Sequence, residues 1–294
     1  MEEFQFCETP KCTNRPLTQS TYCWLHLQEK AAYLKRLIDS KDLKQAYLAK
    51  IEIDDLHLNR RDLSCAILNG ARMTGAKLSD VNFKQATLCH VILDGAALRH
   101  CDFTSAIGDG ASFAAATGNG LKLPWSQFKY ANFTRADFVS CDLTEAVLTG
   151  SLLLRARFEG AKMLGIFLDH ADLEEADLNG ADLSYAVLGG ARLKGANLAD
   201  TQLKRANLLG ADLRGACLHK SSMVKALPIR ADLRGADLQG ANLQGVLFLE
   251  ADLRDAVFDG ANLRSANFER ALIKGASFNG ADIRNTNLKN AITD

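Results

Sequence analysis

The sequence repeats every five residues over most of its length, and this period limits what the chain can fold into. In residues 171–200, ADLEEADLNGADLSYAVLGGARLKGANLAD, each unit has a small residue, Asp or Asn, Leu and two variable positions. With the Leu as its centre, the repeat keeps its phase from Leu43 to Leu288, which gives fifty consecutive units. Of these centres 47 are Leu, Phe, Ile or Met, and the exceptions are Gly108, Gly118 and Pro228.

A period of five fits neither a helix nor a strand. A helix presents an apolar residue about every 3.6 positions and a strand every second position, so a sustained period of five requires a bend after each unit. The centre and the small residue two positions before it, which is Ala in 34 units, then point to one interior. The other three positions hold mainly charged residues, amides and Gly, which we expect to face solvent.

The units resemble the pentapeptide-repeat family, whose motif A(D/N)LXX is matched over about five sixths of the chain. The resemblance implies an all-β solenoid, a right-handed four-sided β-helix in which four units form one coil. Fifty units then give about 12 coils, roughly 60 Å long at the ~4.8 Å spacing of neighbouring strands. We divide the chain into residues 1–40, with a zinc-binding segment and a capping helix, and residues 41–294, the β-helix.

Four potential metal ligands precede the repeats: Cys7, Cys12, Cys23 and His26 form the pattern C-x4-C-x10-C-x2-H. Three thiolates and an imidazole at short spacing suit a tetrahedral zinc ion, and the segment resembles small bacterial treble-clef-like or knuckle motifs. Four ligands imply no open coordination position, so we predict a structural zinc. The alternative is that these residues are free thiols on a flexible terminus, but a segment with so little apolar content would fold poorly without metal.

Residues 24–38, WLHLQEKAAYLKRLI, predict an amphipathic helix with Leu27, Ala31, Leu34 and Ile38 on one side. We expect it to cover the open strand edges of the first coil. Lys41 and Arg61 occupy small inward positions, so the first regular coil is expected to begin between residues 43 and 63.

Two stretches depart from the repeat. In residues 106–128, Gly108 and Gly118 replace two interior Leu, and Pro124 and Trp125 follow. Because the period does not shift, the stretch is either a loop that projects from the coil or a thin, Ala-rich coil with two small cavities. In residues 221–230, Pro228 removes a backbone donor, which predicts a bend or small bulge at a corner.

Residues twenty apart share a face if four units form a coil, and one face is mainly apolar where the others mostly carry Asp, Asn, Lys or Arg. We predict that this apolar face is a protein-contact surface, because soluble proteins rarely expose large apolar patches. The alternative, that β-branched residues favour strands, does not explain a preference confined mainly to one face. The predicted contact residues are Tyr47, Ile67, Ile107, Val147, Phe167, Val187, Leu209, Leu227, Ile229, Leu247 and Leu249.

Composition limits the function. Lys plus Arg and Asp plus Glu number 35 each, so no net field attracts nucleic acid or an anionic membrane. No run of eighteen apolar residues occurs, and eight unevenly placed cysteines do not form a disulfide framework, which favours a reducing, cytoplasmic compartment. The sequence contains no phosphate loop, no Ser/His/Asp set and no defensible carboxylate pair, so we predict that the protein is not an enzyme.

The leading hypothesis is a non-enzymatic interaction or scaffold protein that binds a protein partner through the apolar face, the zinc segment, or both. Homodimerisation through the C-terminal coil or the apolar face is a further expectation. The alternative, suggested by the family resemblance, is protection of DNA gyrase through mimicry of DNA, which requires a dense negative surface that this neutral chain lacks. Nucleic-acid binding by the zinc segment is disfavoured because its basic residues are offset by as many acids.

Overall fold

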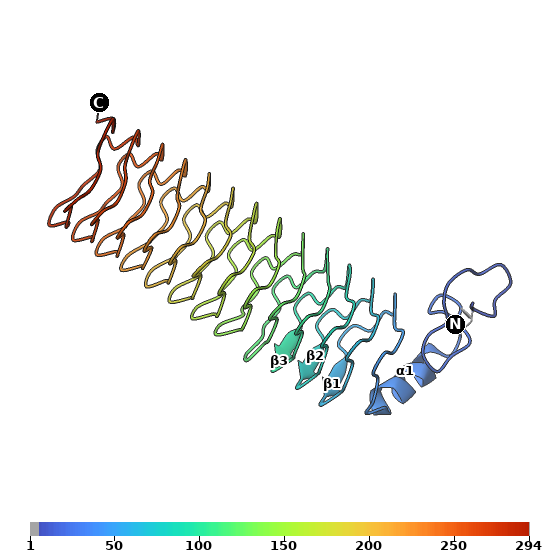
Figure 1. Cartoon of the computed structure of the whole chain (residues 1–294). Coiled ribbons are helices and arrows are strands. Elements are labelled where there is room, and N and C mark those ends of the chain that lie inside the picture. Colours follow the sequence, from blue (N-terminus) through green and yellow to red (C-terminus); the bar gives the residue numbers. More distant parts are fainter. Residues whose placement is uncertain (1–5, 294) are drawn as a thin grey trace.

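The structure, a computed structural model, describes residues 6–293 and is a straight rod of stacked coils with a small N-terminal segment at one end (Figure 1). Helix α1, Lys30–Asp39, precedes the coils. The strands β1 (His57–Asn59), β2 (Lys77–Ser79) and β3 (Ala97–Arg99) form a parallel sheet in the order β1-β2-β3. Along the rest of the rod, single parallel bridges take the place of longer strands.

The coils repeat every twenty residues. Leu58 pairs with Leu78 and Leu78 with Leu98, and the isolated bridges from Asp42 to Ile292 all join residues twenty apart. Four units therefore make one coil of the β-helix, as the family resemblance implied.

Each unit bends because its last residue adopts a left-handed conformation. The last residue of nearly every unit has a positive φ. This holds for glycines such as Gly180 and also for residues with a side chain, such as Tyr185. The Asp or Asn before the centre supports the bend: Asp182 Oδ1 accepts the Ser184 N–H at 3.0 Å. The Leu183 N–H donates to the next coil at Gln202 O (2.7 Å), which links the bend to the stack.

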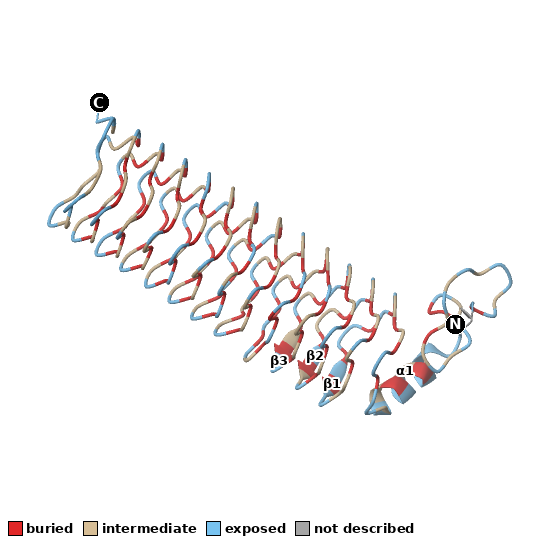
Figure 2. Cartoon of the chain, viewed as in Figure 1, coloured by how far each residue is buried: buried red, intermediate tan, exposed pale blue. Residues whose placement is uncertain are grey.

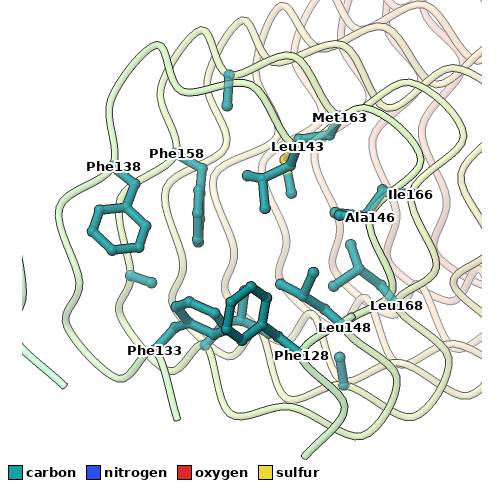
Figure 3. Packing of buried hydrophobic residues seen from close by; sticks show 14 of the residues in the cluster. Phe128, Phe133, Phe138, Leu143, Ala146, Leu148, Phe158, Met163, Ile166 and Leu168 are labelled. Atoms are coloured by element: carbon teal, nitrogen blue, oxygen red, sulfur yellow. The ribbon is translucent and has the colours of Figure 1, made fainter. Parts of the chain in front are cut away.

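The interior is filled by the centres and the small residues, which are buried along the rod (Figure 2). Side chains from four sides meet in the middle, as Phe133, Phe158 and Met163 show (Figure 3). Pairs of Phe rings twenty residues apart are in contact in adjacent coils. Three of them stack with centroids 4.7–5.1 Å apart, whereas Phe138 and Phe158 meet edge to face. The interior is therefore solid and contains no channel within residues 43–271.

Residues 106–128 form a regular thin coil, so the projecting loop is the wrong alternative. Bridges continue through the stretch, for example between Ile107 and Gln127. The two expected cavities are filled by neighbouring rings: a Cβ built on Gly108 would lie 2.2 Å from Phe128 Cε1, and one on Gly118 would lie 3.3 Å from Phe138 Cδ1. Gly108 therefore makes room for Phe128.

Gly108→Ala is expected to destabilise the rod by about 1–3 kcal/mol, because the added methyl group overlaps the Phe128 ring. Gly108 does not have a positive φ, so the loss would measure overlap and not backbone strain. The double variant Gly108→Ala/Phe128→Leu should recover part of the stability in denaturant unfolding. A single variant as stable as the wild type would show that the ring does not occupy this space.

The coil also stays regular around Pro228, where we expected a bend or a bulge. The proline removes one ladder bond, since it has no N–H to donate to the next coil, and no bridge forms between Leu227 and Leu247. The bonds on either side are kept: the Leu208 N–H donates to Leu227 O at 3.1 Å, and the Leu247 N–H donates to Ala226 O at 3.1 Å. The loss of this one backbone hydrogen bond therefore does not change the path of the chain.

Helix α1 is shorter than predicted. It begins at Lys30 and not near residue 24, and it buries Tyr33 and Leu37 against the first coils. Residues 24–29 do not join the helix, because the Cys23 carbonyl accepts the N–H groups of His26 and Leu27 in a tight turn.

Arg61, which occupies a position of the repeat that usually holds a small inward residue, binds the end of helix α1. Arg61 does not enter the core: its guanidinium donates from Nε and Nη2 to Ile38 O at 3.3 and 3.0 Å, which satisfies a terminal carbonyl of the helix. Lys41, the other charged residue at a small inward position, is exposed.

Candidate functional site

Cys7, Cys12, Cys23 and His26 lie together at the N-terminal end of the rod. Their ligand atoms are all within 4.8 Å of one another. His26 Nδ1 lies 3.5 Å from Cys7 Sγ and 3.3 Å from Cys23 Sγ, and Cys12 Sγ lies 3.9 Å from Cys23 Sγ. With Zn–S at about 2.3 Å and Zn–N at about 2.0–2.1 Å, neighbouring atoms of a tetrahedral site lie about 3.6–3.8 Å apart. The group therefore fits a zinc ion.

The surroundings of Cys7 favour its thiolate, the form that binds metal. Burial raises the pKa of the Cys7 thiol, but hydrogen bonds from the backbone of Cys23 and from Thr9 outweigh burial and lower this pKa to about 6. The Asn14 amide donates to Cys23 Sγ at 3.8 Å. Such contacts to the sulfurs orient metal ligands and help to hold their charge.

The cluster is joined to the rod by the loop between Cys12 and Cys23. Thr18 pairs with the first coil: its N–H donates to Tyr47 O at 3.0 Å, and its Oγ1 accepts the Tyr47 N–H at 2.6 Å. Tyr33 of helix α1 donates to Thr18 O at 3.0 Å. The Arg15 guanidinium lies over the Tyr47 ring, 4.8 Å from its centroid. The N-terminal segment thus covers the edge of the first coil at Tyr47.

The apolar face is the second candidate site. Bridges connect Tyr47 through Ile67, Ile107, Val147 and Phe167 to Val187, Asn207 and Leu227 in one column, and Leu247 continues it. None of the predicted contact residues is buried, and Ile107, Phe167 and Leu209 are exposed. Tyr47 contacts the N-terminal segment, so the accessible part of the column begins after it.

Exposure strengthens the contrast between the faces. Between residues 57 and 271, nine large hydrophobic residues are exposed, and seven belong to the apolar face or to the two corners beside it. The other two, Ile92 and Leu152, lie on the next face. The seven are Ile107, Trp125, Tyr130, Leu164, Phe167, Tyr185 and Leu209.

Sequence reasoning missed the corner residues of this surface. The contact residues predicted from the sequence do not include Tyr130, Leu164 or Tyr185, and they do not include Trp125, which lies in the stretch expected to be either a loop or a thin coil. Sorting the last two residues of each unit by the same interval of twenty would have placed all four beside the apolar face.

The family is decided by comparison of the sequence with family models. Eight matches to the model of pentapeptide repeats together span residues 42–104 and 126–290. The chain belongs to the pentapeptide-repeat family. The unmatched residues 105–125 coincide with the thin coil, where Gly replaces Leu at two centres. Members of the family are generally non-enzymatic interaction proteins.

The chain also matches solved structures of other pentapeptide-repeat proteins. HetL, involved in heterocyst differentiation regulation in the cyanobacterium Nostoc sp. strain PCC 7120, is 27% identical with a TM-score of 0.38, over 91% of this chain and 96% of HetL. QnrB1, a plasmid-mediated fluoroquinolone resistance protein, is 20% identical with a TM-score of 0.32, over 60% and 85% of the two chains. Rfr23 from the cyanobacterium Cyanothece 51142 is 25% identical with a TM-score of 0.17, over 54% and 91%. Curated proteins give no match.

The face next to the apolar one carries a ladder of mixed charge. Arg234 Nη2 lies 2.6 Å from Asp232, and its Nε lies 3.5 Å from Asp252 in the next coil. Arg214 makes both kinds of contact, with Asp212 and Asp232, whereas Arg254 makes only the contact with Asp252 in its own unit. The Arg214 hydrogen bond lowers the pKa of the Asp212 carboxyl, and the Arg254 hydrogen bond lowers the pKa of the Asp252 carboxyl. Exposed pairs of this kind contribute little each. The ladder thus makes this face a solvated one.

No second metal-binding group of three or more His, Cys, Asp or Glu residues occurs within residues 6–293 of this pentapeptide-repeat protein. Cys101 and Cys141 lie in the core, and burial raises the pKa of the Cys101 thiol to about 12. In the same residues no helix is long and apolar enough to cross a membrane.

Proposed function

We propose that this pentapeptide-repeat protein is a non-enzymatic scaffold that binds a protein partner along its apolar face. The observation that carries the proposal concerns residues 57–271, where seven of the nine exposed large hydrophobic residues lie on this face and its corners. Buried apolar area and aromatic anchors supply most of the energy of protein interfaces. Here Trp125, Tyr130, Phe167 and Tyr185 would be such anchors.

The zinc segment completes this proposal as a structural module. A zinc ion held by Cys7, Cys12, Cys23 and His26 would fix the loop that carries Thr18, and so the cover over the first coil. The scaffold would then be a rod of about 12 coils, roughly 60 Å long at ordinary strand spacing, with residues 1–40 as its cap. Eight free cysteines suit a reducing compartment, and we assign the protein to the cytoplasm on that basis.

Protection of DNA gyrase is the less supported function. Mimicry of DNA depends on a dense negative surface, and this chain carries 35 acidic and 35 basic residues. Self-association through the last coil is a separate proposal, based on Ile283, Leu288 and Ile292, which are 54%, 47% and 47% exposed.

Polar replacement of Phe167, Val187 and Leu247 together is expected to weaken partner capture at least about tenfold while leaving the melting temperature nearly unchanged. Capture would be measured with the immobilised protein in a lysate of its native host, by quantitative mass spectrometry of bound proteins. The matched control replaces Ile92 and Leu152, which have similar exposure on the next face. Equal capture by wild type and triple variant would contradict the proposal, and loss of folding would show that the side chains point inward.

A further inference from the structure

The central column of the apolar face lacks charged residues in thirteen successive coils. Neither exposure to solvent nor contact with a different protein requires this. The equivalent columns of the other three faces include charged residues such as Asp177, Asp182 and Arg192. The uncharged column is Tyr47, Ile67, Thr87, Ile107, Gln127, Val147, Phe167, Val187, Asn207, Leu227, Leu247, Asn267 and Asn287.

We infer that the apolar face pairs with the apolar face of a second copy, with the two rods side by side, pointing the same way, about a two-fold axis parallel to the rod. The inference rests on the proposed function and names its partner. A two-fold axis in this direction places each column residue opposite its own copy, without any choice of register. A charged residue would then face a like charge, at a cost of several kcal/mol, which accounts for the absence of charge.

The polar members of the column fit the same arrangement. Gln127 and Asn207 have amide side chains, each of which donates and accepts, so a residue facing its own copy forms a satisfied hydrogen bond. Apolar residues such as Phe167 meet their own copies, so polar groups meet polar groups and apolar groups meet apolar groups along the central column.

A second β-helix also has the right axial repeat. Coils follow one another at about 4.8 Å, whereas the turns of an α-helix follow at about 5.4 Å, so a helix laid along the rod loses register by about 7 Å over 12 coils. A second copy keeps register from end to end. The face is roughly 60 Å long and roughly 15 Å wide, about 900 Å² per copy, against about 800 Å² per partner in a standard interface.

Aromatic side chains at the corners beside the face would also meet in this dimer. Trp125 and Tyr130 lie in the same coil, at the two corners on either side of the apolar face. The two-fold axis places Trp125 of one copy opposite the partner's Tyr130. The two rings would therefore meet twice in each dimer.

Single cysteines in the column test the arrangement. Gln127→Cys, Phe167→Cys and Asn207→Cys would be made separately in a background with Ser at Cys65, Cys89 and Cys217, which keeps the zinc ligands. Each should form a disulfide-linked dimer under mild oxidation, because each faces its own copy. Thr117→Cys, exposed on the opposite face, should not. Cross-linking of one column position alone would overturn the parallel two-fold arrangement, because antiparallel rods juxtapose at most the residue on their axis.

Charge insertion gives the second test. Gln127→Glu changes the charge with almost no change of shape, and the dimer dissociation constant at pH 7 in analytical ultracentrifugation should rise at least about tenfold. Thr117→Glu on the opposite face is the control and should leave the constant unchanged. A wild-type protein that stays monomeric up to about 100 µM would overturn the self-pairing, while partner capture from lysate would still test the proposed function separately.

Discussion

A Cys23→Ser variant is expected to lose the zinc ion and, with it, the folded N-terminal segment. Cys23 Sγ lies near both Cys12 Sγ and His26 Nδ1, so its loss leaves three ligands around the site. Binding of structural zinc contributes about 10–16 kcal/mol to the folding of zinc-finger peptides at pH 7, which makes this the largest effect we predict. Wild-type protein purified without chelator should carry about one zinc per chain by elemental analysis, and the variant should carry none.

The same variant should uncover the first coil. Thr18 is held between the ligands, so hydrogen exchange at the Tyr47 amide should accelerate when the loop unfolds, while the amide of Leu183 in mid-rod should not change. Cys65→Ser is the matched control, because Cys65 is exposed and outside the cluster. Wild-type protein that contains no zinc would refute the metal site.

Leu183→Asp is expected to destabilise the rod by several kcal/mol, because it places a carboxylate among fully buried side chains. Leu183 has no exposed surface, and neither do Met163 and Leu203, which occupy the same position in the coils before and after it. An unpaired buried charge is among the few changes that cost about 4 kcal/mol or more.

Its neighbour Asp182 supplies the control. Asp182→Ala removes one hydrogen bond, from the Ser184 N–H, and should cost about 1 kcal/mol. Both variants would be compared in thermal and urea unfolding. Equal losses would mean that the inward and outward positions of the unit had been exchanged.

The rod could be predicted well from the sequence because each unit repeats the same local pattern of residues. Asp or Asn before the centre, a residue that accepts positive φ at the end, and Leu or Ala inward can be read without knowing any distant contact. The interval of twenty between paired residues followed from the family resemblance, and it placed Phe83 beside Phe103 and Ile67 beside Tyr47.

The errors arose where a distant residue decides the local structure. Gly108 suggested a loop, because the sequence does not show that the Phe128 ring would occupy the space of the missing side chain. Residues 24–29 fitted a helical pattern, but the turn that holds His26 near Cys23 takes precedence. The pattern of the four ligands was sufficient to place them together, since their spacing is short.

Footprinting of the apolar face tests the central claim most directly. The protein would be labelled with a side-chain-reactive carbene, once as a dilute monomer and once in the complex recovered from its native host, and the modified residues would be quantified by mass spectrometry. We predict that labelling falls several-fold at Ile107, Phe167 and Leu209 on binding. Ile92 and Leu152, with comparable exposure on the next face, should be labelled equally in both samples. Protection of Ile92 and Leu152 with unchanged labelling at Ile107 and Phe167 would contradict the assignment of the apolar face as the binding surface.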